Sequence, residues 1–368
     1  MNLPNQLRLL SVLVLFLVFL PGGIRAEDKQ VSVYFIGNSL TASTTLDRVH
    51  GLFKQRGIDL QFGSQLSGGK SLFRHLNYKN EPNQKWVSWE TSVPDGTTFS
   101  PDKNYHTTDP ATWRFGRYDT ALANHKWDVV VMQPFVGSPL HDELKAVTAF
   151  MALALEKNPE VKFYIYQTWP RRPKLPGTSQ SPDAGVAQDI DYPAEWNTLY
   201  TASVDDVSKE AGKNAGTRSF YSRLREEASK KFPDLKNPIR LIPVGEVLFA
   251  LDKTIKDGSL PGLEELLIRD PSKVPGWSAE KGLIRGVNIV YADPVHFNPM
   301  PHNKGVLGNL ISGTTIFSVL SGESPVGLSA EGYQFDADKD AAIVKAVQEL
   351  IWKIVTSDPM TGVSWPLR

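Results

Sequence analysis

The feature that most constrains the fold is a set of short runs rich in β-branched and aromatic residues. The clearest is the continuous apolar run Asp128-Val-Val-Val-Met132, and further short runs of this kind lie at residues 31–36, 59–62, 162–166 and 240–243. A strand with one wet face alternates apolar and polar residues, whereas a continuous apolar run is buried on both faces, as in parallel sheets covered by helices. These segments predict five strands of one buried sheet.

Helical patterns lie between the predicted strands, at residues 45–56, 143–157, 200–232, 244–257 and 304–320. We expect the long third helix to break near its glycines, residues 212–216. Strands that alternate with helices predict a three-layer α/β/α sandwich. Five strands fit a flavodoxin-like, mostly parallel sheet better than a closed barrel of eight.

The first 26 residues have the layout of a secretory signal peptide. A basic residue, Arg8, precedes an apolar stretch at residues 9–20, which ends at Pro21, and Ala26 offers a small residue for cleavage. The stretch is short for a bilayer span of about twenty residues, so an uncleaved anchor is the weaker alternative. We expect residues 27–368 to form a single domain without a membrane span, in a secreted or periplasmic protein.

Two long segments, near residues 77–126 and 170–195, do not fit the alternation of strands and helices. They hold many turn residues together with several tryptophans. Loops of this length inside a compact domain are uncommon and are usually functional or disordered. We interpret both as loop insertions in the domain.

The composition excludes several classes of function. The 368 residues include no cysteine, which rules out disulfides, thiolate catalysis and cysteine-ligated zinc. Basic and acidic side chains number 40 each, without the basic excess that usually marks a nucleic-acid-binding protein. The histidines show no metal-ligand spacing such as H-E-x-x-H, so we expect neither a metal nor a cofactor.

Polar residues follow the predicted strands at the edge where open α/β sheets bind ligands. They are Gly37-Asn38-Ser39 after the first run, the loop 66–71 with Gly69 after the second, Gln133 after the third, Trp169 after the fourth, and Asp293 with His296 after an apolar run at 288–291. A serine between a strand and a helix has its N–H at the positive end of that helix, where it can stabilise an oxyanion. Its hydroxyl needs a base, commonly a histidine oriented by a carboxylate.

Each segment has another interpretation when it is taken alone. Gly37-Asn38-Ser39 is more often a turn or a helix N-cap, and Ser67-Gly68-Gly69 is more often an ordinary loop. Asp293-Pro-Val-His296 is also compatible with an exposed turn or half of a metal site. His302 is the rival base, but it has no acid three residues before it.

In this chain order the motifs resemble those of the GDSL-type, or SGNH, hydrolases, over about residues 30–330. The family's first block, G-D-S-L, corresponds to Gly37-Asn38-Ser39-Leu40, and its last, D-x-x-H, to Asp293-Pro-Val-His296. Its second block has a glycine in a small-residue loop, as at residues 67–72. Two departures are Asn38 in place of aspartate and Gln133 in place of the asparagine of the third block, G-x-N-D. A bacterial subgroup that pairs G-N-S with glutamine is the most similar in both respects.

The resemblance implies a two-step ester hydrolysis. Ser39 would attack the acyl carbon, His296 would take and return the proton, and Asp293 would orient the imidazole. The oxyanion would be held by three donors, which are the N–H groups of Ser39 and Gly69 and the amide of Gln133. We further expect three residues near these blocks to contact the substrate, namely Asn38, His75 and Trp169.

Export and family habit favour a small acyl ester or an acylated carbohydrate as the substrate, with removal of an acetyl group as the expected reaction. The departures at Asn38 and Gln133 motivate an alternative, a catalytically weak or inactive carbohydrate- or envelope-binding protein, because a fold does not imply an activity. A third hypothesis is a metal-dependent phosphoesterase that uses Asp293 and His296 as ligands.

Overall fold

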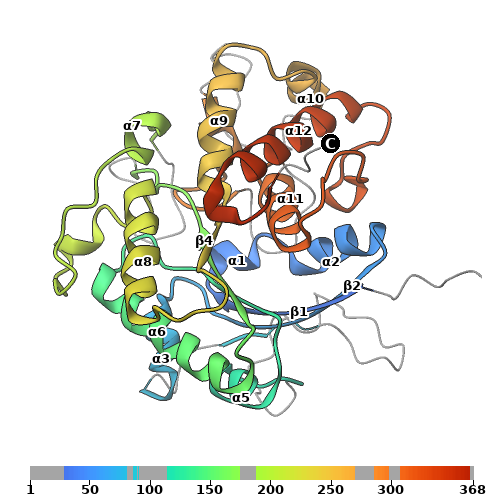
Figure 1. Cartoon of the computed structure of the whole chain (residues 1–368). Coiled ribbons are helices and arrows are strands. Elements are labelled where there is room, and N and C mark those ends of the chain that lie inside the picture. Colours follow the sequence, from blue (N-terminus) through green and yellow to red (C-terminus); the bar gives the residue numbers. More distant parts are fainter. Residues whose placement is uncertain are drawn as a thin grey trace, which may run out of the picture.

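The computed structural model describes residues 29–80, 86–88, 90, 114–174, 188–269, 286–297 and 307–364. Within these ranges, five strands form one sheet in the order β2-β1-β3-β4-β5 (Figure 1). The strands are β1 (Lys29–Gly37), β2 (Ile58–Leu66), β3 (Val129–Met132), β4 (Lys162–Gln167) and β5 (Arg240–Pro243). Every neighbouring pair is parallel. The predicted three-layer fold with a flavodoxin-like sheet is therefore confirmed.

The register of the central strands brings their carboxyl ends to one level. Gly37, the last residue of β1, pairs with Leu66, the last residue of β2. On the other side of β1, Ile36 pairs with Met132, the last residue of β3. Three loops therefore leave the sheet side by side, and the polar residues that follow these strands meet there.

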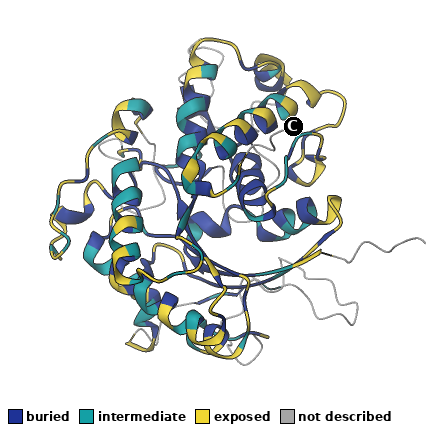
Figure 2. Cartoon of the chain, in the orientation of Figure 1, coloured by how far each residue is buried: buried dark blue, intermediate teal, exposed yellow. Residues whose placement is uncertain are grey.

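Helices cover both faces of the sheet (Figure 1). On one face lie α2 (Leu46–Gln55), α9 (Val244–Lys256), α11 (Leu307–Ser321) and α12 (Ala341–Ser357). On the other lie α3 (Leu72–Leu76), α5 (Tyr118–Asn124), α6 (Leu140–Lys157) and α8 (Arg218–Lys231). Figure 2 shows the strands and the inward sides of these helices buried, with exposed residues on their outer sides. The core thus fills the two interfaces between the sheet and the helix layers.

Short elements complete the described chain. The remaining α-helices are α1 (Ser39–Ala42), α7 (Tyr192–Trp196) and α10 (Leu263–Arg269). The 3₁₀ turns are η1 (Tyr78–Asn80), η3 (Glu210–Gly212), η6 (Gly286–Val290), η7 (Glu331–Tyr333) and η8 (Pro359–Thr361). Both α5 and α7 lie inside the segments that we interpreted as loop insertions, parts of which lie outside the described residues.

Some helix predictions differ from the structure. The pattern at 200–232 is α-helical only at α8, from Arg218 to Lys231, and the chain before it holds irregular structure and the 3₁₀ turn η3. Gly216 adopts φ +90° at the predicted break near residues 212–216, just before α8 begins. Helix α6 begins at Leu140, three residues before the predicted start. Helix α12 was not predicted, although Ile343, Val347 and Ile351 recur every four residues and are buried.

The predicted signal peptide at residues 1–26 lies outside the described residues. Within the described ranges, no helix is both long enough and apolar enough to cross a bilayer.

Two glycines in helices offer a test of the packing between layers. A Cβ on Gly245 of α9 would lie 2.2 Å from the Trp196 ring and 2.5 Å from the Thr168 carbonyl oxygen, whereas a Cβ on Gly51 of α2 would meet nothing within 4 Å. We expect Gly245→Ala to lower the free energy of unfolding by about 1–3 kcal/mol through overpacking, despite the better helix propensity of alanine. Gly51→Ala should raise it by up to about 1 kcal/mol. Urea unfolding of both variants measures the two effects, and equal shifts would contradict this account of the interface.

Candidate active site

The segment that follows β1, residues 37–41, is called the serine segment below. It presents Ser39 at the start of a short helix. Asn38 is the N-cap of α1, with extended backbone angles, and its side-chain oxygen accepts the Leu40 N–H at 3.0 Å. Ser39 is the first residue of α1 and is partly exposed, whereas both of its neighbours are buried. A Cβ on Gly37 would lie 2.4 Å from the Thr41 hydroxyl and 3.0 Å from the Gln133 side chain, so a larger residue here would displace side chains of the site.

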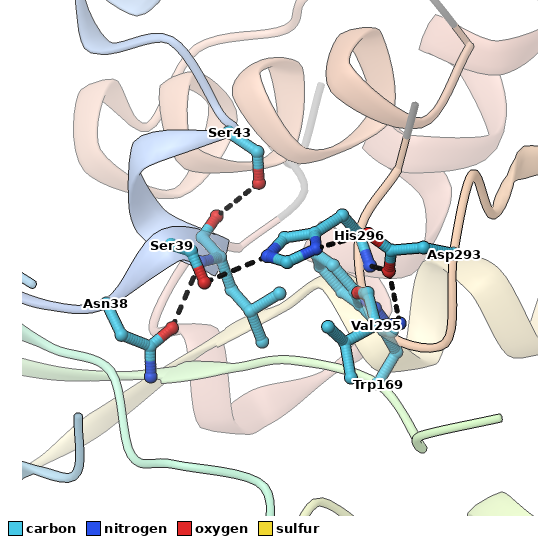
Figure 3. Close-up of polar contacts among 8 residues, drawn as sticks. Asn38, Ser39, Ser43, Trp169, Asp293, Val295 and His296 are labelled. Atoms are coloured by element: carbon cyan, nitrogen blue, oxygen red, sulfur yellow. Dashed lines mark hydrogen bonds and ion pairs between the residues drawn. The ribbon is translucent and has the colours of Figure 1, made fainter. Parts of the chain in front are cut away.

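Three side chains are joined in one hydrogen-bonded series (Figure 3). The Ser39 Oγ lies 2.9 Å from the Nε2 of His296, and the Nδ1 of the same ring lies 2.7 Å from Oδ2 of Asp293. The imidazole is almost fully buried, while Asp293 is partly exposed. This order of a hydroxyl, an imidazole and a carboxylate is the arrangement in which a histidine can take the serine proton.

The carboxylate of Asp293 is held by the turn that it caps. Its second oxygen, Oδ1, accepts the N–H groups of Val295 at 2.7 Å and His296 at 2.8 Å. Burial by itself would raise the pKa of Asp293, but the hydrogen bonds and the charge of His296 outweigh burial and bring this pKa below its ordinary value. The group is therefore an anion at neutral pH, and it fixes Nδ1 of the imidazole as the protonated nitrogen.

The loop after β4 braces this turn. The Trp169 indole N–H donates to the Val295 carbonyl at 2.7 Å, and the Arg172 N–H donates to the Pro294 carbonyl at 2.8 Å. The Trp169 ring also stacks on Phe297, with centroids 3.7 Å apart. Because these contacts flank His296 in the sequence, they set the direction from which its ring approaches Ser39.

Gln133 connects the loop after β3 to the serine segment. Its Oε1 accepts the Asn38 N–H at 3.0 Å and the Thr41 hydroxyl at 3.1 Å, and its Nε2 donates to the Pro134 carbonyl. A backbone N–H can only donate and a carbonyl can only accept, so these partners define the orientation of the amide. One hydrogen of Nε2 is left for a further acceptor. No sequence signal had pointed to Thr41.

The loop after β2 carries Gly69 in the left-handed region, at φ +67°. The loop is tied to the serine segment by the Asn38 side-chain N–H, which donates to the Lys70 carbonyl at 3.1 Å, and by the Ser67 N–H, which donates to the Gly37 carbonyl at 3.2 Å. An aspartate in place of Asn38 would have no N–H for the Lys70 carbonyl. Gly69 itself is exposed, and the described residues provide no acceptor for its N–H.

The residues predicted to contact substrate occupy buried positions. Asn38 is 1% exposed and Trp169 is 1% exposed, and both are engaged in the contacts described above. His75 is fully buried, with its Nδ1 3.2 Å from the Gln65 amide nitrogen and its ring edge-on to Trp86. Each of the three side chains is thus buried beneath the surface of the site and contacts the loops that form it. Their contact with a substrate stays a prediction.

The rival base His302 lies outside the described residues. The apolar run before Asp293 is the 3₁₀ turn η6 rather than a strand, so the acid and base do not follow a strand of the sheet. Within the part of the chain that the structure describes, no group of three or more His, Asp or Glu side chains is placed to hold a metal ion.

Comparison with known proteins supports the fold. A search of family models and a search of curated proteins both found no match. Among solved structures, a DUF4886 family protein from Bacteroides uniformis is similar at 16% identity and a TM-score of 0.51, covering 89% of this chain and 96% of its own. This likeness extends over nearly the whole of that chain and shows a shared fold.

More distant structures were also found. One is a putative GDSL-like lipase from Parabacteroides merdae, with 9% identity, a TM-score of 0.35, and coverage of 80% of this chain and 97% of that chain. Another is a carbohydrate esterase family 2 enzyme with a carbohydrate-binding domain from Corynascus thermopiles, with 13% identity, a TM-score of 0.24, and coverage of 58% and 56%.

The brace from the loop after β4 can be tested with a matched pair of substitutions. Trp169→Phe keeps an aromatic ring against Phe297 but removes the hydrogen bond to Val295, and Trp127→Phe removes a similar buried bond, at 2.9 Å, to the Ala121 carbonyl on α5. We expect each variant to lose about 1–2 kcal/mol of unfolding free energy. Only Trp169→Phe should also slow the ester hydrolysis that the sequence motifs predict, by about fivefold or more, because the turn that carries His296 loosens. Equal turnover in the two variants would show that the brace has no effect on the base.

Burial lowers the pKa of His75 to about 3. In the unfolded chain an imidazole titrates near pH 6.5, so below this pH the unfolded state binds a proton that the folded state does not. The free energy of unfolding should therefore fall as the pH drops from about 6.5 towards about 3, by ~1.4 kcal/mol per pH unit. Between pH 7.5 and pH 4.5, urea unfolding should show that His75→Gln loses about 2–3 kcal/mol less than the unsubstituted protein. The same loss in both proteins would place the titrating group elsewhere.

Proposed function

We propose that this protein is an exported serine ester hydrolase that works through an acyl-serine intermediate. The observation that carries the proposal is the series Ser39–His296–Asp293, with contacts of 2.9 Å and 2.7 Å at the carboxyl edge of a parallel sheet. The likeness of Gly37-Asn38-Ser39-Leu40 and Asp293-Pro-Val-His296 to the SGNH blocks supports the same assignment. So does the partial exposure of Ser39 beside an otherwise buried imidazole.

In the first step, the Ser39 Oγ attacks the acyl carbon while Nε2 of His296 takes the hydroxyl proton. The bond between the acyl carbon and the alcohol oxygen then breaks, and His296 delivers the proton to the departing alcohol. In the second step, a water attacks the acyl-serine, His296 takes a proton from that water, and the acid leaves as Ser39 regains its hydrogen. Asp293 stays ionised throughout and stabilises the imidazolium.

The oxyanion of each tetrahedral intermediate needs donors that are already in place. The N–H of Ser39 lies at the first position of α1, and the N–H of Gly69 lies on an exposed turn. The free hydrogen on Nε2 of Gln133 is the third donor that we propose. Each such donor contributes about a hundredfold or more to turnover in well-studied hydrolases.

The substrate that we propose is a small acyl ester, with an acetylated carbohydrate as the leading class. The proposed signal peptide places the enzyme where such envelope or extracellular material occurs. The competing function is that of a carbohydrate- or envelope-binding protein with little activity. One observation favours it, namely that the Gln133 amide already serves Asn38, Thr41 and Pro134 and has a single hydrogen to spare.

The two functions are separated by the reactivity of Ser39. We expect a fluorophosphonate probe to label the unsubstituted protein at Ser39, and Ser39→Ala to lower kcat/KM on p-nitrophenyl acetate and acetylated polysaccharide by at least about a thousandfold. Ser43→Ala is the matched control, because Ser43 lies four residues later and its hydroxyl donates to the Leu40 carbonyl, while its backbone N–H, which bonds to the Ser39 carbonyl, is kept in the variant. It should stay within a few-fold of the unsubstituted protein.

Three outcomes would count against the proposal. Absence of labelling together with undiminished carbohydrate binding would favour the binding protein. Undiminished hydrolysis by Ser39→Ala would place the nucleophile elsewhere. Loss of hydrolysis in EDTA would favour the metal-dependent phosphoesterase, whereas the serine mechanism expects no effect of EDTA.

A further inference from the structure

The three loops that carry the proposed oxyanion donors are joined in pairs by polar contacts. The serine segment is tied to the loop after β2 through Asn38 and the Lys70 carbonyl, and to the loop after β3 through Asn38 and Gln133. These contacts connect each loop to the serine segment. A direct connection between the loops after β2 and β3 comes from Glu143 of α6.

Glu143 lies in the first turn of α6 and is fully buried. Its Oε2 accepts the N–H of Leu72 at 3.2 Å, and its Oε1 accepts the N–H of Phe135 at 3.3 Å. The Ser138 hydroxyl also bonds to this carboxylate. Leu72 is three residues after Gly69, and Phe135 is two residues after Gln133, so one side chain holds both loops close to the donors that they carry.

A carboxylate is well suited to these partners. Leu72 is the first residue of α3, and its N–H has no acceptor within that helix. A glutamate has two acceptor oxygens that diverge, whereas a glutamine has one oxygen and would point its NH₂ group at an N–H. Burying a carboxylate is unfavourable, and burial accordingly raises the pKa of Glu143 to about 8. A residue that served packing alone would avoid this penalty.

We propose that Glu143 is a positioning residue, which sets the spacing of the Gly69 and Gln133 loops and acts on the oxyanion through them. Its kinetic consequence rests on the proposed esterase function, but its effect on the two loops does not. The ionised carboxylate accepts both N–H groups. Protonation places a hydrogen on one oxygen opposite an N–H donor, and the two loops then lose part of their common anchor.

The charged and titratable groups around Glu143 can be named. Asp142 of its own helix raises the pKa of Glu143, and Glu143 in turn raises that of Tyr221 on α8. Its contacts from α3 and from the loop after β3 are the two N–H groups and the Ser138 hydroxyl. Tyr221 is buried, and burial raises its pKa above 10, so it stays neutral over the range in which Glu143 titrates.

The kinetic test compares Glu143→Gln with Asp142→Asn, which removes the same charge one residue earlier on the same helix. We expect Glu143→Gln to lower kcat by about tenfold to a hundredfold with KM changed by less than about threefold, because misplaced donors act on the transition state. In the unsubstituted protein, kcat should rise with pH near pH 8 as Glu143 ionises, and this rise should be absent from Glu143→Gln. Asp142→Asn should retain the rate and should keep the rise, moved to a slightly lower pH because Asp142 raises the pKa of Glu143. An unchanged kcat and pH profile in Glu143→Gln would overturn the proposal.

A second measurement does not depend on activity. In an ¹⁵N-labelled sample, the amide signals of Leu72 and Phe135 should follow one common titration near pH 8 in the unsubstituted protein, and one at a slightly lower pH in Asp142→Asn. That titration should be absent in Glu143→Gln. If it persists there, or if the two amides share no titration at any pH at which the unsubstituted protein is folded, the tie between the loops is refuted. Should Glu143→Gln fail to fold, Glu143→Asp replaces it, because its shorter carboxylate cannot reach both N–H groups.

The kinetic test and the amide titration also separate this inference from the proposed function. If the unsubstituted protein hydrolyses no ester and Ser39 is not labelled, the esterase proposal fails, and the amide titration still decides whether Glu143 holds the two loops. If hydrolysis and labelling are found but the amides do not respond, the esterase proposal stands and the role of Glu143 is wrong.

Discussion

The shared direction of the five strands is the constraint on which the rest of this structure depends. Parallel pairing puts the carboxyl ends of β1, β2 and β3 at one level, and their loops leave the sheet together. Backbone N–H and C=O groups in such buried loops must find partners, since an unpaired buried group is costly. Here the partners are polar side chains of the neighbouring loops, so satisfying the backbone also assembles the site.

Asn38, Gln133 and Glu143 illustrate this principle. All three are buried, and each accepts a backbone N–H. Asn38 accepts that of Leu40 in its own loop, Gln133 accepts that of Asn38, and Glu143 accepts that of Leu72. Asn38 and Gln133 are also the two positions at which the sequence departs from the G-D-S-L and G-x-N-D blocks that it resembles. The amide at Asn38 can donate to one loop and accept within its own, which a carboxylate cannot do.

The acid and base reach the serine by a different route. The turn that carries Asp293 and His296 does not follow a strand, and its position is set by the loop after β4 through Trp169 and Arg172. The bond between Ser39 and His296 joins two parts of the chain that are 257 residues apart. The relative placement of nucleophile and base therefore depends on the packing of β4 and its loop beside β3.

The sequence by itself predicted the class of fold, and it pointed to Ser39, Asp293 and His296 as the polar residues of a candidate site. Continuous apolar runs such as 129–132 imply burial on both faces, and alternation with helices implies parallel strands, because these patterns follow from local geometry. Only the tertiary structure decided that Trp169 and His75 are buried beneath the site, that Thr41 bonds to Gln133, and that Glu143 joins two loops. These contacts link residues up to 126 positions apart in the chain, as between Trp169 and Val295. No local pattern encodes such distances, because they arise from how the strands are ordered and how the helices pack on them.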